Sequence, residues 1–306
     1  MSHWSRRAWW VTTGLALAAS LVASGSVALA QSPAASSAAS PSPAPTCSPL
    51  PTIPVGWAFY SPSPGASLVA LTDLTVFAAA SLNKPFSVMG RSWAAQHPGS
   101  ELTFSFDASS ALRAQIEEGA PADVFASADV RNPQALIDGC LAPAPMFVFA
   151  TNHLVIVVPA ANPAGIASPA DLATAGVRIV AAGDEVPITK YAEQLISNIA
   201  AQAGAPAGYV DAVHANIVSR EDNVSAVLAK VALGEGDAGI VYVSDATNVD
   251  GLTAIKVADD VNVLATYGAV EVATTSAPAT SAAFLAYLTG AEGQAILARY
   301  GFLPPQ

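Results

Sequence analysis

The sequence predicts an α/β fold in which mostly parallel sheets are flanked by helices. Short β-branched or aromatic runs alternate with segments whose apolar residues recur at helical spacing. Several predicted strands pass directly into helices through small or hydroxylic residues, most clearly in residues 74–82, where three alanines and Ser81 follow a β-type run. We expect Ser81 near the N-cap of the next helix, where backbone N–H groups attract anions, although a lone junction is better explained by capping alone.

The composition narrows the classes of partner. Of the 306 residues 52% are hydrophobic, and 23 acidic side chains stand against 12 basic ones. This length and apolar content support one or two ordinary domains. An acidic chain without a Lys/Arg cluster argues against nucleic acid or an anionic membrane as a partner, so an anion site would have to rely on local dipoles. The four histidines and two cysteines lack metal-ligand spacing, so we expect neither a structural zinc nor a cofactor.

The N-terminus has the features of an export signal. Arg6 and Arg7 precede an apolar segment at residues 11–27, and Ala28-Leu29-Ala30 forms an A-x-A cleavage site. We expect residues 1–30 to be a signal peptide that is cleaved after Ala30. An uncleaved membrane anchor is the alternative, but the small residues and the lack of a charged flank favour cleavage. The mature protein is thus expected in the periplasm or at the cell surface.

A Pro/Ser/Ala-rich segment, residues 31–70, follows and is expected to be a flexible tether, because it has few large apolar groups to bury. It contains Cys47, which follows Ala44-Pro45-Thr46 and so lacks the context of a lipidated cysteine. Outside the cytoplasm Cys47 and Cys140 can form a disulfide. The alternative is two unpaired thiols, and the sequence does not decide between them.

The remaining chain alternates predicted strands and helices. We expect a strand in the β-type run that begins at residue 74, and further strands at residues 101–106, 122–129, 147–158, 177–180, 213–218, 239–243, 256–264 and 268–273. Helices are expected after Ser81, over residues 112–119, 132–139 and 281–300, and beginning near residues 168, 187 and 223. In such an alternation ligands collect at the carboxyl ends of strands.

Four strand-to-helix junctions and one tyrosine then stand out. The junctions lie at Ser81, Ser109, Pro187-Ile188 and Asn223-Val224, and Tyr242 ends a buried strand. At these positions the sequence resembles the periplasmic or extracellular molybdate-binding proteins of molybdate ABC importers. The matching segments are 76–82 (VFAAASL), 108–110 (ASS), 115–125 (QIEEGAPADVF), 127–129 (SAD), 183–184 (GD), 186–187 (VP), 191–192 (YA), 239–242 (GIVY), 244–246 (SDA) and 299–302 (RYGF). Each is weak alone, but together and in order they are specific.

The resemblance implies the type II periplasmic binding protein fold, in which two α/β lobes are joined by two crossover strands around a ligand cleft. Lobe 1 would comprise residues 71–149 and 269–306, and lobe 2 residues 150–268. By position, the oxyanion would be held by the hydroxyls of Ser81, Ser109 and Tyr242 and by the backbone at Ile188 and Val224. Molybdenum would be present only as molybdate, with no direct metal-ion ligand. The implied protein is a non-enzymatic monomer that delivers molybdate, and we expect also tungstate, to a membrane permease.

The chemistry of such a site is consistent with that ligand. A tetrahedral oxydianion offers only acceptors, so a site built only of donors suits it, whereas a protonated phosphate also needs an acceptor. Two features depart from the family pattern. Ile188-Thr189-Lys190 replaces small residues, so Ile188 is expected to narrow the pocket and Thr189 or Lys190 to add a donor. Pro85 has no N–H for the carbonyl of Ser81, so that helix is expected to begin late.

Alternatives remain at this point. The ligand could be another oxyanion such as sulfate. An exported serine hydrolase is a further alternative, but the chain has no G-x-S-x-G elbow. An adhesion or cell-wall protein would use the Pro/Ser/Ala segment and bind no anion. Four aspartates in loops could form a metal-binding or acid/base set: Asp123, Asp129, Asp184 and Asp245. Aspartates in such loops more often cap a helix or accept hydrogen bonds from the backbone.

Overall fold

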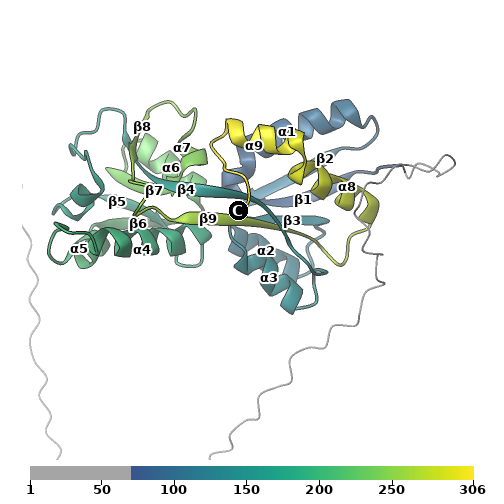
Figure 1. Cartoon of the computed structure of the whole chain (residues 1–306), viewed down its shortest axis with the longest axis horizontal. Helices are drawn as coiled ribbons and strands as arrows, with labels where there is room; N and C mark the ends of the chain where they lie inside the picture. The colour runs from purple at the N-terminus through teal and green to yellow at the C-terminus, as the bar shows by residue number, and fades with distance from the viewer. Residues whose placement is uncertain (1–69) are drawn as a thin grey trace, which may run out of the picture. The chain divides into compact units, whose positions relative to one another are not determined.

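A mixed nine-stranded sheet with helices on both sides is the framework of residues 70–306, the part of the chain that the computed structural model describes (Figure 1). The expected signal peptide and almost all of the Pro/Ser/Ala-rich segment, including Cys47, lie outside the described residues. The strands are β1 (Leu74–Ala79), β2 (Leu102–Asp107), β3 (Val124–Ser127), β4 (Phe147–Pro159), β5 (Ile179–Ala182), β6 (Ile217–Glu221), β7 (Ala238–Tyr242), β8 (Leu252–Lys256) and β9 (Leu264–Glu271). Their order is β2-β1-β3-β9-β4-β7-β5-β6, with β8 paired to β4.

The helices lie around two ends of this sheet. They are α1 (Asn83–Gln96), α2 (Ser109–Glu117), α3 (Arg131–Asp138), α4 (Pro187–Ala200), α5 (Tyr209–Ala215), α6 (Val224–Ala232), α7 (Val243–Ala246), α8 (Pro278–Thr289) and α9 (Ala291–Arg299), with short 3-10 helices η1 (Ala80–Leu82) and η2 (Pro169–Ala173). In Figure 1, α1–α3, α8 and α9 surround β1–β3, and α4–α7 surround β5–β7. The long strands β4 and β9 run through both ends.

The expectation of mostly parallel sheets is only partly correct. β1 pairs in parallel with β2 and β3, and β5 pairs in parallel with β6 and β7. The pairs β3–β9, β9–β4, β4–β7 and β4–β8 are antiparallel. The cause is the path of the chain, which passes from one end to the other through β4 and returns through β9. These two strands therefore run in opposite directions.

Apolar side chains at helical spacing join α1 to the sheet. Phe86, Met89 and Trp93 are buried against it, and Phe86 and Trp93 both make edge contacts with Phe284 of α8. Burying an apolar side chain of this size contributes about 1.5–3 kcal/mol. The strand β1 is almost completely buried, so its carboxyl end, where Ser81 follows, is held in a fixed place.

Three predicted elements are wrong in their boundaries. The predicted strand at 213–218 begins as helix α5, in which Tyr209 and Val213 are buried one turn apart. The predicted strand at 256–264 is a loop over 257–263, because the Asn262 side chain bonds both the N–H and the C=O of Leu154 and takes the place of a strand partner. The predicted helix 281–300 is two helices, α8 and α9, separated at Gly290.

Within residues 70–306, none of the helices combines the length and apolar character required to span a bilayer.

Candidate ligand-binding site

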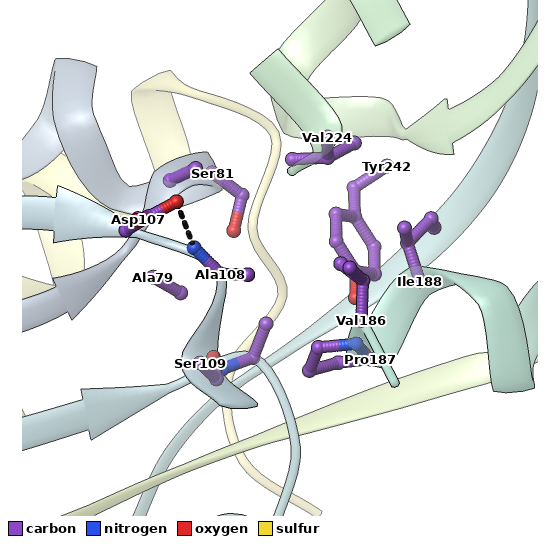
Figure 2. Close-up of a pocket in the computed structure, with 12 residues that line it drawn as sticks. Ala79, Ser81, Asp107, Ala108, Ser109, Val186, Pro187, Ile188, Val224 and Tyr242 are labelled. Carbon is purple, nitrogen blue, oxygen red and sulfur yellow. Dashed lines mark hydrogen bonds between the residues drawn. The ribbon is translucent and has the colours of Figure 1, made fainter. Parts of the chain in front are cut away.

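The carboxyl ends of β1, β2 and β7 and the first turns of α2, α4 and α6 meet around a small cavity. Its empty space, with the open solvent at its mouth included, is about 210 Å³. All five residues predicted to bind a ligand line this cavity: Ser81, Ser109, Ile188, Val224 and Tyr242. Figure 2 shows them on two facing walls. We call Ser81 and Ser109 the serine wall, and Ile188, Val224 and Tyr242 the tyrosine wall.

Ser81 lies in the 3-10 helix η1, between β1 and α1. The prediction of a place near the helix start is correct, since Leu82 is the N-cap of α1, but the Ser81 side chain caps nothing. Its Oγ instead lies 3.0 Å from the hydroxyl of Tyr267. The expected late start of the helix is also observed, because Pro85 cannot donate to the Ser81 carbonyl and α1 begins only at Asn83.

Ser109 is the first residue of α2 and is 1% exposed. Its Oγ accepts a hydrogen bond of 3.0 Å from the backbone N–H of Ala128. A hydroxyl that accepts one hydrogen bond still has its own proton to donate. The contact with Ala128 therefore fixes the oxygen of Ser109 while leaving a donor for the cavity.

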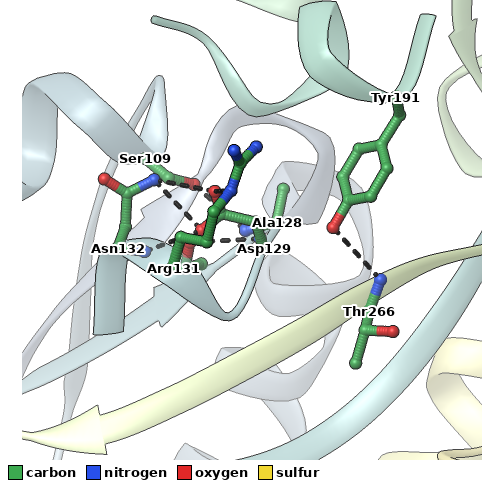
Figure 3. A network of polar contacts seen from close by, with 8 residues as sticks. Ser109, Ala128, Asp129, Arg131, Asn132, Tyr191 and Thr266 are labelled. Atoms are coloured by element: carbon green, nitrogen blue, oxygen red, sulfur yellow. Dashed lines mark hydrogen bonds and ion pairs between the residues drawn. The ribbon is translucent and has the colours of Figure 1, made fainter. Parts of the chain in front are cut away.

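A buried polar network supports this contact from behind (Figure 3). Asp129 accepts hydrogen bonds from the Ser127 hydroxyl at 2.9 Å and from the Asn132 backbone at 3.0 Å, and it pairs with Arg131 at 3.8 Å. These bonds fix the loop after β3, which contains Ala128. Asp129 thus holds the loop that positions Ser109.

On the tyrosine wall, α4 begins at Pro187 and α6 at Val224. The first N–H groups of a helix have no partner inside it and form the positive end of its dipole. Ile188 and Val224 both lie in such first turns and line the cavity. Asn223 caps α6 by accepting a 3.1 Å bond from Ala226, which leaves the earlier N–H groups for another acceptor.

The structure shows where the three residues that depart from the family pattern, Ile188, Thr189 and Lys190, lie relative to the cavity. Ile188 is 2% exposed and lines the cavity. The expectation that Thr189 adds a donor to the site is wrong, because its hydroxyl donates to the carbonyls of Ala182 and Gly183 at 3.1 and 2.8 Å. Lys190 is exposed and lies outside the lining.

Tyr242 ends β7 and is 1% exposed, yet within residues 70–306 its hydroxyl has no hydrogen-bond partner. Its ring packs edge-on against Tyr191 and Tyr267, at centroid distances of 6.3 and 5.6 Å. Burial raises the pKa of Tyr242 well above its usual value, so the hydroxyl stays protonated. An unpaired buried hydroxyl costs about 1–3 kcal/mol, which a ligand in the cavity would recover.

Two site residues were not predicted from the sequence. Asp107 lines the cavity, and its Oδ1 accepts hydrogen bonds from Ala108 N–H at 2.8 Å and from the Asn223 amide at 2.9 Å. It thereby joins the carboxyl end of β2 to the cap of α6. Tyr267 supports Ser81. The position of Asp107 at a strand end was a usable signal, whereas nothing local marks Tyr267.

The four loop aspartates act as caps, backbone acceptors or ion-pair partners. Asp123 accepts from Thr75 N–H and Asp245 from Tyr242 N–H, Asp129 accepts from Asn132 N–H, and Asp184 pairs with Arg220. The described part of the chain contains no group of three or more His, Cys, Asp or Glu side chains that could hold a metal ion.

The site as a whole offers neutral donors to a small ligand. Its lining includes three hydroxyls, the first turns of three helices and one carboxylate, Asp107, whose Oδ1 accepts from Ala108 and Asn223. Among the described residues no Lys or Arg side chain belongs to it. Such a set suits a small, fully deprotonated anion, which presents only acceptors.

Comparison with known proteins agrees with this description. The sequence matches the family of bacterial extracellular solute-binding proteins over residues 74–303, the class that the fold and cavity indicate. This class is non-enzymatic, which removes the serine hydrolase alternative.

More closely, the Molybdate-binding protein ModA of Mycobacterium tuberculosis is 36% identical over 244 residues, which cover 79% of this chain and 89% of that protein. The Escherichia coli protein of the same name is 30% identical over 245 residues, covering 78% and 91%. The periplasmic molybdate-binding protein of Azotobacter vinelandii has the same fold, with a TM-score of 0.66 at 24% identity, covering 76% of this chain and all of that one. The chain therefore belongs to the ModA family of molybdate-binding proteins.

Proposed function

We propose that this protein captures molybdate between two lobes and delivers it to an ABC permease. The observation that carries the proposal is the convergence of five donor positions on one cavity, including the buried hydroxyl of Tyr242, which has no hydrogen-bond partner within residues 70–306. The two serines and Tyr242 would donate through their hydroxyls, and Ile188 and Val224 through the backbone. The relatives named for molybdate binding support the choice of ligand.

The donor set also indicates which anions compete. Tungstate has the charge and tetrahedral shape of molybdate, so we propose that it binds as well. Sulfate offers the same acceptors, and its discrimination would depend on the size of the cavity. Phosphate is less suited because its proton needs an acceptor, which none of the five proposed donor positions supplies. Asp107 is the one carboxylate in the lining, and its Oδ1 already accepts two hydrogen bonds. Neutral donors would also release the anion more readily than a buried pair of arginines.

For the whole chain we propose residues 71–149 and 269–306 as lobe 1 and residues 150–268 as lobe 2. β4 and β9, which pair with each other and run through both ends of the sheet, support this division. Closure of the lobes would sequester the anion and present both lobes to the permease. We further propose that the mature protein is a monomer cleaved after Ala30. The Cys47–Cys140 disulfide stays a prediction, since Cys47 lies outside the described residues.

Calorimetric titration of the mature protein with molybdate, tungstate, sulfate and phosphate tests the proposal. We expect one site per chain that binds molybdate and tungstate tightly and the other two anions weakly. Tight binding of sulfate without molybdate would overturn the assignment of the ligand. Binding of none of the four would overturn the proposed function.

A further inference from the structure

Tyr267 contacts two of the proposed ligand residues without lining the cavity. It lies on β9, is completely buried, and its hydroxyl is 3.0 Å from Ser81 Oγ. Its ring packs edge-on against the ring of Tyr242 at 5.6 Å. Tyr267 thus connects the serine wall to the tyrosine wall.

The register of the crossover strands brings Asn152 to the same place. On β4, Ala150 pairs with Tyr267 and Asn152 lies two residues further on, so the side chains of Asn152 and Tyr267 are on one face of the sheet. The Asn152 amide donates to Ser244 Oγ at 2.8 Å. Asn152 is fully buried, and its Oδ1 has no hydrogen-bond partner within residues 70–306.

The direction of the hydrogen bond between Ser81 and Tyr267 depends on which of the two hydroxyls donates the proton. At 3.0 Å either the Ser81 or the Tyr267 hydroxyl can donate to the other, and an anion in the cavity decides between them because it presents only acceptors. When Ser81, which lines the cavity, donates its one proton to the anion, its Oγ can only accept on its protein side. The Tyr267 hydroxyl is then the donor of that contact.

We propose that Tyr267 is a positioning residue of the anion site, which donates to Ser81 so that the Ser81 proton is directed at the ligand. The inference rests on the proposed function, since it needs an anion between the two walls. Tyr267 contributes no bond to the ligand itself. With the anion bound, it supplies the proton that Ser81 Oγ accepts, which holds this oxygen while the Ser81 proton faces the ligand.

The test is a double-mutant cycle measured by calorimetric titration with molybdate. Tyr267→Phe removes the hydroxyl but keeps the ring that packs on Tyr242, and it should weaken binding about three- to tenfold, the worth of one net hydrogen bond. Ser81→Ala should weaken binding at least as much. Adding Tyr267→Phe to Ser81→Ala should change the affinity by less than about twofold, because the hydroxyl of Tyr267 acts only through Ser81.

Tyr209→Phe is the matched control. Tyr209 is also buried, and its hydroxyl donates to the Pro169 carbonyl at 2.7 Å, in contact with η2 and not with the cavity. This variant should lower the melting temperature without changing the affinity for molybdate. If Tyr267→Phe does not fold, Tyr267→Leu replaces it, because it also removes the hydroxyl while keeping a buried apolar side chain at this position.

The outcomes separate the two proposals. Unchanged or tighter binding by Tyr267→Phe, with weaker binding by Ser81→Ala, would overturn the positioning role and leave the proposed function standing. Additive losses in the double variant would overturn it as well, since Tyr267 would then act independently of Ser81. A wild-type protein that binds no molybdate would overturn the proposed function and this inference together.

Discussion

The two walls of the cavity hold their donors in different ways. On the serine wall each hydroxyl oxygen has a protein neighbour, Tyr267 for Ser81 and Ala128 for Ser109. On the tyrosine wall the hydroxyl of Tyr242 is buried without a hydrogen-bond partner within residues 70–306. The serine hydroxyls therefore have hydrogen-bond partners before a ligand arrives, whereas the Tyr242 hydroxyl would gain its partner from the ligand.

This difference has an energetic consequence. A buried polar group without a partner destabilises the folded protein by about 1–3 kcal/mol, and a new partner recovers that free energy. Anion binding would thus stabilise the folded protein by giving the Tyr242 hydroxyl a partner. The hydroxyls of Ser81 and Ser109 contribute to the stability of the folded protein without a ligand. Variants of the two walls should differ in the ligand-free protein even where their effects on binding are alike.

The largest effect is expected when one donor is removed from each wall. Ser109→Ala combined with Tyr242→Phe deletes two hydrogen bonds to a charged ligand, each worth about 1.5–3 kcal/mol. The affinity for molybdate should fall about 100-fold or more, as measured by calorimetric titration. A loss below tenfold in a folded double variant would show that neither wall binds the anion through these hydroxyls.

The single variants sharpen the comparison. Tyr242→Phe and Ser109→Ala should each weaken molybdate binding about tenfold or more. In ligand-free protein, Tyr242→Phe should leave the melting temperature unchanged or raise it, since no protein partner is lost. Ser109→Ala should lower it, because the Ala128 N–H loses its acceptor. Scanning calorimetry without ligand measures both, and equal shifts in the two variants would contradict the contrast between the walls.

A smaller effect is expected when Lys84 is replaced, because its side chain connects the segment after Ser81 to the segment after Tyr242 by hydrogen bonds. It lies in α1 just after Ser81, and its Nζ donates to the carbonyls of Asp245 and Thr247, at 3.3 and 2.9 Å, just after Tyr242. Lys84→Met should weaken molybdate binding about two- to fivefold, since these bonds hold the walls together. Lys190→Met is the control, because it removes an exposed charge on α4 without such a tie. Equal losses in both variants would indicate simple electrostatic attraction.

The last expected effect concerns the pH dependence of stability and involves Asp245, which accepts from the Tyr242 N–H. Burial raises the pKa of Asp245 to about 7 from 3.8, against the lowering effects of the Tyr242 N–H and Lys84. The folded protein therefore keeps a proton that the unfolded chain releases between about pH 4 and 7. Asp245 makes the free energy of unfolding fall as the pH rises through this range, by at most about 1.4 kcal/mol per pH unit, and has no further effect above it.

Asp245→Asn isolates this contribution. The amide oxygen can still accept from the Tyr242 N–H, but it carries no titrating proton. Urea unfolding from pH 4 to 8 should show that the variant lacks part of the decline seen in the wild type between pH 4 and 7. Parallel pH profiles for the two proteins would contradict a raised pKa at Asp245.

Much of this site could be predicted from the sequence because its parts are local. A strand that ends in alanines and serine at Ser81, or a proline that opens a helix at Pro187, leaves a trace within ten residues. All five predicted positions line the cavity for this reason. The resemblance to a family supplied what local patterns lack, namely that these junctions share one ligand.

The rest depended on contacts between distant segments. Tyr267 meets Ser81 across 186 positions of sequence, and Asn262 replaces a strand partner for Leu154 across 108. Neither contact has a local pattern, so Tyr267 was missed and the strand near residue 260 was wrong. The direction of β9 was missed similarly, because parallel and antiparallel pairing depends on the path of the whole chain.

Anomalous X-ray scattering at the molybdenum edge, from crystals of the mature protein grown with molybdate, tests the central claim most directly. It locates the metal of the anion without assuming where it binds. We predict one strong peak per chain between the two walls, with anion oxygens within hydrogen-bonding distance of the hydroxyls of Ser81, Ser109 and Tyr242. A peak elsewhere, or an empty cavity with molybdate present at saturating concentration, would contradict it.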